Sequence, residues 1–173
     1  MEGLMMNHPL TVPMIIEHGN RTFPTKEVIS IMPDKSTHRY SIADMYRRSK
    51  RLAHALKHQL CVRAGDMVGT YAWNHYQHME LYYGIPGAGA ICHTINIRLS
   101  AAQTEFIVND AEDEFIFIDA SLVPFFEKIR SALRTVKGYI VLNAPAGFTT
   151  TLPNCLDYEE LLAKGSEEND WEP

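Results

Sequence analysis

Two histidines, His75 and His78, stand three residues apart in a predicted helix, a spacing that can place two metal ligands on one helix face. Helical zinc sites of hydrolases, however, follow the pattern HExxH, and Glu80 does not occupy the matching position. The pair is more typical of solvent-exposed or helix-capping histidines than of metal ligands. We therefore expect no metal site from these residues.

Nucleophilic chemistry would require an activated side chain beside a base. Cys92 and His93 are neighbours in a predicted strand, but adjacent strand residues point to opposite faces and cannot form a nucleophile–base pair. The sequence also contains no GxSxG motif. Four acidic residues between a predicted helix and strand are expected to be solvated: Asp110, Glu112, Asp113 and Glu114. His93 itself remains open between a hydrogen-bonded core residue and a ligand-facing one.

Phosphate binding would require a glycine-rich turn that opens a helix. Neither GxGxxG nor GxxxxGK[ST] occurs, and Gly84, Gly87 and Gly89 lie at the end of a predicted helix. A helix C-terminus offers carbonyl groups instead of free N–H groups. Close packing of a helix on a strand explains these glycines better.

The elements that position these residues alternate between strand and helix. A hairpin is predicted from Lys26–Met32 and His38–Tyr40, and Ser41 caps an amphipathic helix that runs to about Leu60. Capping boxes are predicted at Asn74/Gln77 and Ser100/Gln103. The remaining predicted strands are Met67–Trp73, Ala90–Asn96, Glu114–Asp119 and Gly138–Leu142, and further helices span Ser100–Asp110 and Ser121–Val136. This order predicts an α/β fold, a mostly parallel sheet with helices on both faces, preceded by a β-hairpin.

Composition divides the chain into three segments. Residues 1–24 read as an N-terminal arm with a short helix around Met14–His18, and residues 25–143 form the α/β unit. Residues 144–173 contain a short acidic helix, Tyr158–Lys164, then an exposed acidic linker, with no further strand. The basic residues on the first long helix are predicted to form its solvated face: Arg47, Arg48, Lys50 and Arg51.

The bulk composition narrows the functional class. A net charge of -5 disfavours nonspecific nucleic-acid binding, and no apolar run is long enough to span a membrane. Three cysteines without metal-like spacing favour a reducing compartment, and the N-terminus does not resemble a signal peptide. These features predict a cytoplasmic protein.

Three ordered segments are more specific than any single motif. They are Val62–Val68, Ala72–Asn74 with Glu80–Tyr82, and Pro86–Ala90 continuing through His93–Ser100. Together with Arg39–Ser41 and Ile107–Asp113, they resemble the N-terminal region of adenylate-forming acyl-CoA synthetases, especially the medium- and long-chain fatty-acid ligases. The resemblance covers the chain from about Pro9 to its end and implies a flavodoxin-like subdomain of the synthetase N-terminal domain.

The resemblance implies a two-step reaction in the parent enzyme: ATP, with Mg²⁺, activates a fatty acid as an acyl-adenylate, and the CoA thiol then displaces AMP. The family's Ser/Thr/Gly-rich loop ending in Pro-Lys-Gly and its later motifs do not occur here, so no catalytic residue is carried over and the chain alone is expected to be inactive. This sequence also has Asn96-Ile97-Arg98 where the family usually has Asn-Pro-Arg, so the loop lacks the φ restraint of proline.

Five matched residues are candidates for substrate binding because they lie at or just beyond the carboxyl ends of predicted strands: Trp73, Asn74, His93, Asn96 and Arg98. Two of these residues could have structural roles instead, since Asn74 is a predicted helix cap and Arg98 could hold a loop. Two other functions compete with the ligase fragment. One is a free-standing flavodoxin-like binding module; the other is a dimerisation domain that forms a homodimer through the N-terminal arm.

Overall fold

A computed structural model describes residues 4, 10–168 and 170–172 of the chain. Part of the predicted N-terminal arm, residues 1–3 and 5–9, lies outside the described residues. The rest of that arm contains helix α1 (Val12–Thr22), which is longer than the predicted Met14–His18 and begins with Pro13 in its first turn. Helix α1 packs against the two long helices that follow it in the chain.

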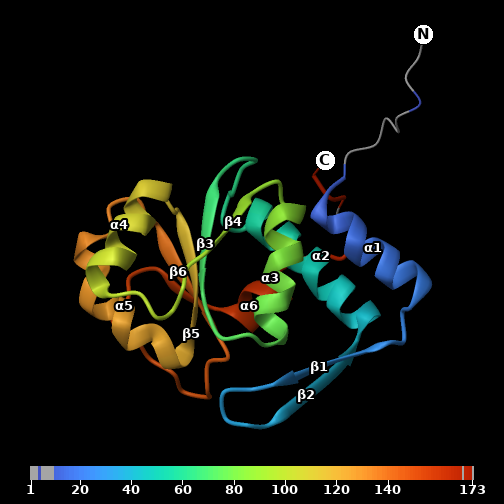
Figure 1. Ribbon diagram of the computed structural model, residues 1–173, viewed down its shortest axis with the longest axis horizontal. Coiled ribbons are helices and arrows are strands. Elements are labelled where there is room, and N and C mark those ends of the chain that lie inside the picture. Colours follow the sequence, from blue (N-terminus) through green and yellow to red (C-terminus); the bar gives the residue numbers. More distant parts are fainter. Residues whose placement is uncertain (1–3, 5–9, 169, 173) are drawn as a thin grey trace.

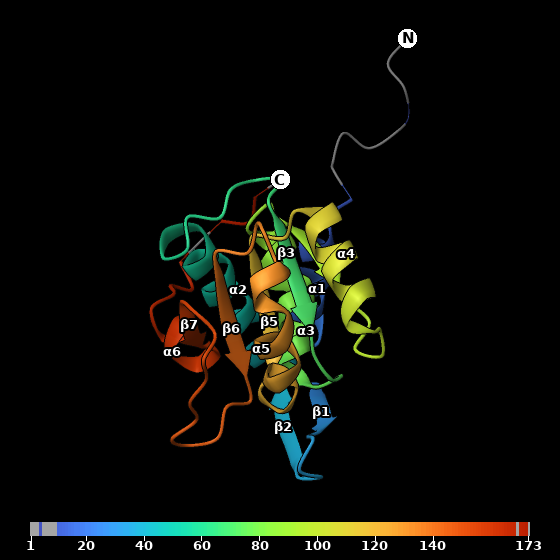
Figure 2. The same cartoon turned by 90° about the vertical axis from the view of Figure 1, so that its left-hand side faces the viewer.

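The predicted hairpin is confirmed. Strands β1 (Glu27–Ile31) and β2 (Thr37–Ser41) pair in antiparallel register, with Glu27 opposite Ser41 and Ile31 opposite Thr37. Lys35 adopts a φ of 68° in the connecting turn. Figures 1 and 2 both show this hairpin projecting from the end of the molecule opposite the C-terminus.

The main sheet has five parallel strands in the order β4-β3-β5-β6-β7. Four of them match the predicted strands: β3 (Met67–Tyr71), β4 (Ile91–Thr94), β5 (Phe115–Asp119) and β6 (Gly138–Leu142). The expectation of no further strand is wrong, because β7 (Cys155–Asp157) pairs with β6. Its three half-buried residues are too few to show a strand pattern in the sequence.

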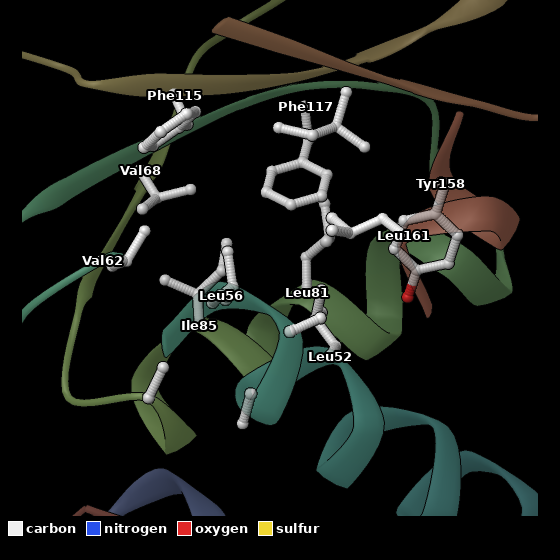
Figure 3. Packing of buried hydrophobic residues seen from close by; sticks show 14 of the residues in the cluster. Leu52, Leu56, Val62, Val68, Leu81, Ile85, Phe115, Phe117, Tyr158 and Leu161 are labelled. Carbon is white, nitrogen blue, oxygen red and sulfur yellow. The ribbon is translucent and has the colours of Figure 1, made fainter. Parts of the chain in front are cut away.

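Helices cover both faces of this sheet, as predicted. Helices α2 (Ile42–His58), α3 (Tyr76–Gly87) and α6 (Tyr158–Ala163) cover one face, and α4 (Ala101–Ala111) and α5 (Val123–Ile129) cover the other (Figure 1). Each face of the sheet has its own hydrophobic core, and alternate residues of β5 pack into the two cores. Phe115 and Phe117 face α2 and α3, whereas Ile116 and Ile118 face α4 and α5. Figure 3 shows the first core, where Leu52, Leu56, Leu81 and Ile85 meet the β5 phenylalanines.

The structure confirms the predicted helix caps at Ser41 and Ser100 and contradicts the one at Asn74. The box at Ser100 and Gln103 is confirmed, and Ser41 caps α2 with Asp44 as its box partner. The predicted Asn74 cap is wrong, because α3 begins at Tyr76 and its N-cap is His75, whose side chain makes no capping bond. The helix predicted from Ser121 begins one residue earlier as a 3-10 turn capped by Asp119, and α5 ends well before Val136.

The C-terminal segment corrects two further expectations. Lys50 is buried and Arg48 partly so, although both were expected on a solvated face. The segment after α6, expected to be an exposed linker, instead lies against α2 and α3: Glu167 pairs with Arg51, and Trp171 packs at Gly87. Glu167 and Glu172 of this segment form ion pairs with Arg51 and Lys57 of α2.

Candidate binding edge of the sheet

The carboxyl ends of β3, β4 and β5 meet at one edge, because these strands are parallel neighbours. Trp73 and Asn74 follow β3, Asn96 and Arg98 follow β4, and Ser121 follows β5. Open α/β sheets bind ligands in the crevice outside the carboxyl ends of their strands. The structure therefore places four of the five predicted site residues at the carboxyl-end edge of the sheet.

Trp73 is tied across this edge to the end of β5. Its indole Nε1 donates to Ser121 Oγ at 3.1 Å, and Ser121 Oγ donates to Asp119 Oδ1 at 2.9 Å. Trp73 as a residue stays 43% exposed. An oriented, partly exposed aromatic ring provides a flat apolar surface for a ligand.

His75 is hydrogen-bonded to the other carboxylate oxygen of Asp119. Its Nε2 lies 3.0 Å from Asp119 Oδ2, and both side chains are fully buried. A carboxylate oxygen accepts hydrogen bonds, so Nε2 of His75 carries the hydrogen. The other ring nitrogen, Nδ1, is buried and has no partner among the described residues.

His78 is also buried, which contradicts the expected exposed histidine. Its Nδ1 donates to the Trp73 carbonyl at 3.1 Å, and its Nε2 lies 3.2 Å from Thr70 Oγ1. Burial lowers the pKa of His78 below the ordinary value, so the neutral imidazole is favoured. His78 therefore braces the β3–α3 turn that carries Trp73.

Asn74 is exposed on the other side of this turn. It lines a groove of about 430 Å³ that runs between β1 and α3, together with His75, His78, Met79 and Tyr82. Since Asn74 does not cap α3, its amide is available to a ligand or to a neighbouring segment.

Asn96 and Arg98 form a loop of their own beyond β4. The Asn96 Oδ1 accepts a hydrogen bond from the Arg98 backbone N–H at 3.0 Å, and both side chains are exposed. The carbonyl of Ile97, where the family usually has proline, accepts a hydrogen bond from Tyr71 Oη at 2.9 Å. This bond from the buried core restrains the loop in place of a proline ring.

His93 lies within β4, and its side chain pairs with the buried Asp113, with Nδ1 and Oδ2 2.8 Å apart. The hydrogen bond to Asp113 raises the pKa of His93 above its ordinary value. Gly69 makes room for this pair, since a Cβ there would lie 3.2 Å from the Asp113 carboxylate. The expectation that Asp113 is solvated is wrong; the other acidic residues of its cluster are at least partly exposed.

The array missed by sequence reasoning consists of His75, Asp119 and Ser121. Asp119 ends a strongly apolar strand and Ser121 follows it, which is the position where an α/β sheet presents polar groups. Burial raises the pKa of the Cys92 thiol in β4 to about 12, which disfavours a nucleophilic thiolate there. Within the described ranges, no three His, Cys, Asp or Glu side chains gather as metal ligands. No described helix is long and apolar enough to cross a bilayer.

Comparisons with known proteins agree with this architecture. Residues 16–170 match the family model of the AMP-binding enzymes. The chain is 38% identical over 162 residues to a long-chain-fatty-acid–CoA ligase of Thermus thermophilus, covering 92% of this chain and 28% of the relative. It is 31% identical over 172 residues to a medium-chain-fatty-acid–CoA ligase of Ectopseudomonas oleovorans, covering 99% and 31%.

Solved structures share the fold. The crystal structure of a long-chain-fatty-acid–CoA ligase from Archaeoglobus fulgidus superposes with a TM-score of 0.80 at 18% identity, over 97% of this chain and 33% of that one. The anthranilate–CoA ligase AuaEII, in complex with anthranoyl-AMP, gives a TM-score of 0.78 at 20% identity, over 96% and 30%. The chain thus spans about a third or less of the relatives it matches. Its residues 16–170 show that it belongs to the AMP-binding enzyme family.

Proposed function

We propose that this chain is the N-terminal portion of an ATP-dependent acyl-CoA ligase acting on fatty acids. The observation that carries the proposal is the 38% identity to the Thermus long-chain ligase across 92% of the chain. The complete enzyme would join a carboxylate to AMP with release of pyrophosphate, and CoA thiol would then displace AMP. Mg²⁺ would accompany ATP and offset charge on the phosphates.

The role proposed for this portion is to frame the acyl or CoA site. The edge array supports this role, because Trp73 is oriented by Ser121 and Asp119 while its ring remains exposed. Asn74, Asn96 and Arg98 are exposed at the same edge and offer polar groups to a substrate. His93 is proposed as a positioning residue, since its imidazole is held by Asp113.

We also propose a division into segments, a cellular location and an oligomeric state. Residues 1–24, 25–143 and 144–173 are proposed as arm, α/β unit and connecting segment of the parent enzyme. A cytoplasmic location is proposed from the three cysteines, all of them free. Homodimerisation through the arm is proposed as well, and sedimentation of the chain with and without its first 24 residues tests it; an unchanged monomer excludes the arm.

The decisive test uses the reading frame that contains this chain. Continuation into a Ser/Thr/Gly-rich loop ending in Pro-Lys-Gly, and AMP-forming acyl-CoA synthesis by the complete polypeptide, are the expected results. A stop after Pro173 excludes the ligase. In the complete enzyme, Arg98→Ala and His93→Ala should change a substrate KM or kcat; if neither parameter moves, these residues have no role in the site.

The isolated chain provides a second test. Because the family's phosphate loop is not present in it, calorimetry should detect no ATP binding at micromolar affinity. Micromolar binding by the 173-residue chain would show that its own residues form a nucleotide site.

A further inference from the structure

We infer that the open edge of β1 is completed by a β-strand from the part of the ligase that this chain does not contain. This inference rests on the proposed function, because it takes the remainder of the ligase as the occupant. The strand would lie in the groove between β1 and α3 and would pair with the backbone of β1.

The backbone of β1 shows which groups are unpaired. The Lys26 carbonyl accepts a hydrogen bond from the Ile42 N–H, and the Met32 N–H donates one to the Ser36 carbonyl. The backbone N–H and C=O groups of the even-numbered residues in β1 therefore point towards β2. In an antiparallel pair the bonding direction alternates with each residue. The N–H and C=O groups of Glu27, Ile29 and Ile31 therefore point to the other edge, and the described residues supply no third strand there.

Of the three β1 residues with unpaired backbone groups, Ile29 and Ile31 have apolar side chains and Glu27 is charged. Ile29 is 51% exposed and Ile31 is 62% exposed, and across the groove Met79 and Tyr82 of α3 are also more than a third exposed. Natural proteins protect a free edge with charges, proline or a bulge, or they cover it.

The groove follows β1 along most of its length. It holds about 430 Å³, and four consecutive residues of β1, Val28–Ile31, form one wall. Met79 and Tyr82 offer apolar contacts on the other wall, and the exposed Asn74 lies at the same groove. Main-chain bonds along β1 would supply affinity, and the apolar wall would select alternate side chains of the incoming strand.

The size of the relatives identifies the occupant. This chain accounts for 28% of the Thermus ligase and 31% of the Ectopseudomonas ligase, so about two-thirds of such an enzyme lies outside the matched region and could supply the strand. The C-terminal segment is already seated on α2 and α3 through Trp171 and Glu172, at the end opposite the hairpin (Figures 1 and 2). The β1–α3 groove is an apolar surface that this segment leaves uncovered, and it lies beside an unpaired strand edge.

Hydrogen exchange of the β1 amides tests the inference, in the 173-residue chain and in the complete polypeptide. Exchange at Glu27, Ile29 and Ile31 should be at least about tenfold slower in the complete polypeptide. Ile29→Pro removes an outward N–H without breaking the β1–β2 ladder, so it should leave the melting temperature of the 173-residue chain unchanged. It should abolish the added protection at Ile31, whereas Ile29→Thr, which keeps the N–H, should retain it.

Acyl-CoA formation, measured on the same samples, separates the two proposals. If the complete polypeptide forms acyl-CoA but the β1 amides exchange as fast as in the chain alone, the strand site is excluded and the ligase stands. If no acyl-CoA forms, the proposed function fails on its own readout. A dimeric 173-residue chain with protected β1 amides, returned to monomer by Ile29→Pro, would assign the edge to a second copy and overturn the inference.

Discussion

Glu80 has no exposed side-chain surface, and its carboxylate accepts a 2.7 Å hydrogen bond from Arg48 Nε. Its second oxygen accepts a 2.7 Å bond from Tyr158 Oη, and Arg48 also holds Glu159 through two nitrogens. Arg48 belongs to α2, Glu80 to α3, and the other two residues to α6. One buried charge pair thus joins the C-terminal helix to the two long helices of the core.

Removing Arg48 should strongly destabilise the chain. Arg48→Ala leaves the Glu80 carboxylate buried without a counter-charge, which costs about 3–5 kcal/mol in comparable buried pairs. Urea unfolding of the 173-residue chain measures the change in free energy. Arg47→Ala is the matched control: Arg47 pairs with Asp44 at the exposed start of the same helix, and its loss should cost under about 1 kcal/mol. Equal effects of the two variants would contradict a buried pair.

The pKa values of His93 and His78 should be shifted in opposite directions. The pKa of His93 is raised by its hydrogen bond to Asp113, whereas burial lowers the pKa of His78. In NMR titrations His93 should therefore change charge above pH 6.5 and His78 below it. Asp113→Asn should bring the pKa of His93 back towards 6.5, and an unchanged His93 would show that the pair does not exist in solution.

The same pair predicts a pH-dependent stability. Because the folded-state pKa of His93 is raised, its contribution is fully present below the unfolded value of about 6.5 and is lost as the pH rises through the folded pKa. The stability difference between the wild-type chain and Asp113→Asn should thus be larger at about pH 6 than at about pH 9. Denaturant unfolding at both pH values measures it; a difference that grows with pH would contradict the sign.

Gly84 allows α2 and α3 to approach closely. A Cβ at this position would lie within 2.7 Å of Leu52 Cγ, inside the core shown in Figure 3. Gly84→Ala should therefore destabilise the chain by about 1–3 kcal/mol through overpacking. Gly19→Ala in α1 is the control, because its Cβ would lie 3.3 Å from Ile42 and the better helix propensity of alanine offsets the contact. A neutral Gly84→Ala would show that the two helices can move apart.

Trp171 should contribute to stability although it lies in a polar, acidic segment. Its ring packs at Gly87 and lies beneath the Lys50 ammonium, 5.0 Å from the ring centroid. Trp171→Ala should cost about 1–3 kcal/mol in denaturant unfolding. Trp73→Ala, which removes a 43% exposed ring, should cost less. A larger loss of stability from Trp73→Ala than from Trp171→Ala would indicate that the segment after α6 is an exposed linker.

The sequence alone predicted most of the regular elements. Strands β3 to β6 and the hairpin follow from short apolar runs bounded by turn residues, and the Ser100/Gln103 box marked the start of α4. These signals are local, since they depend on residues within a few positions of each other. The ordered segments from Val62 to Ser100 also indicated the family, which the match over residues 16–170 confirmed.

The candidate site was predicted only in part, because its residues meet across the sheet. Trp73 and Asn74 could be placed at the edge from the strand that precedes them, but the bond from Trp73 to Ser121 spans 48 residues. The Asp119–His75 pair spans 44, and no local pattern in the sequence joins them. His93 was left open for the same reason, since its partner Asp113 comes from the loop before the next strand.

The sequence by itself determined the class of the fold, the order of its elements and the resemblance to acyl-CoA synthetases. These follow from local hydrophobic periodicity and from motifs in a fixed order. Only the tertiary structure decided which charges are buried. Arg48 and Lys50 had the pattern of a solvated helix face, and residues 165–173 had the composition of a linker. Arg48 is partly buried because Glu80 and Glu159 bind its guanidinium, and Lys50 is buried against the Trp171 ring. Glu159 is 111 residues from Arg48 in the sequence, so no local pattern could show this contact.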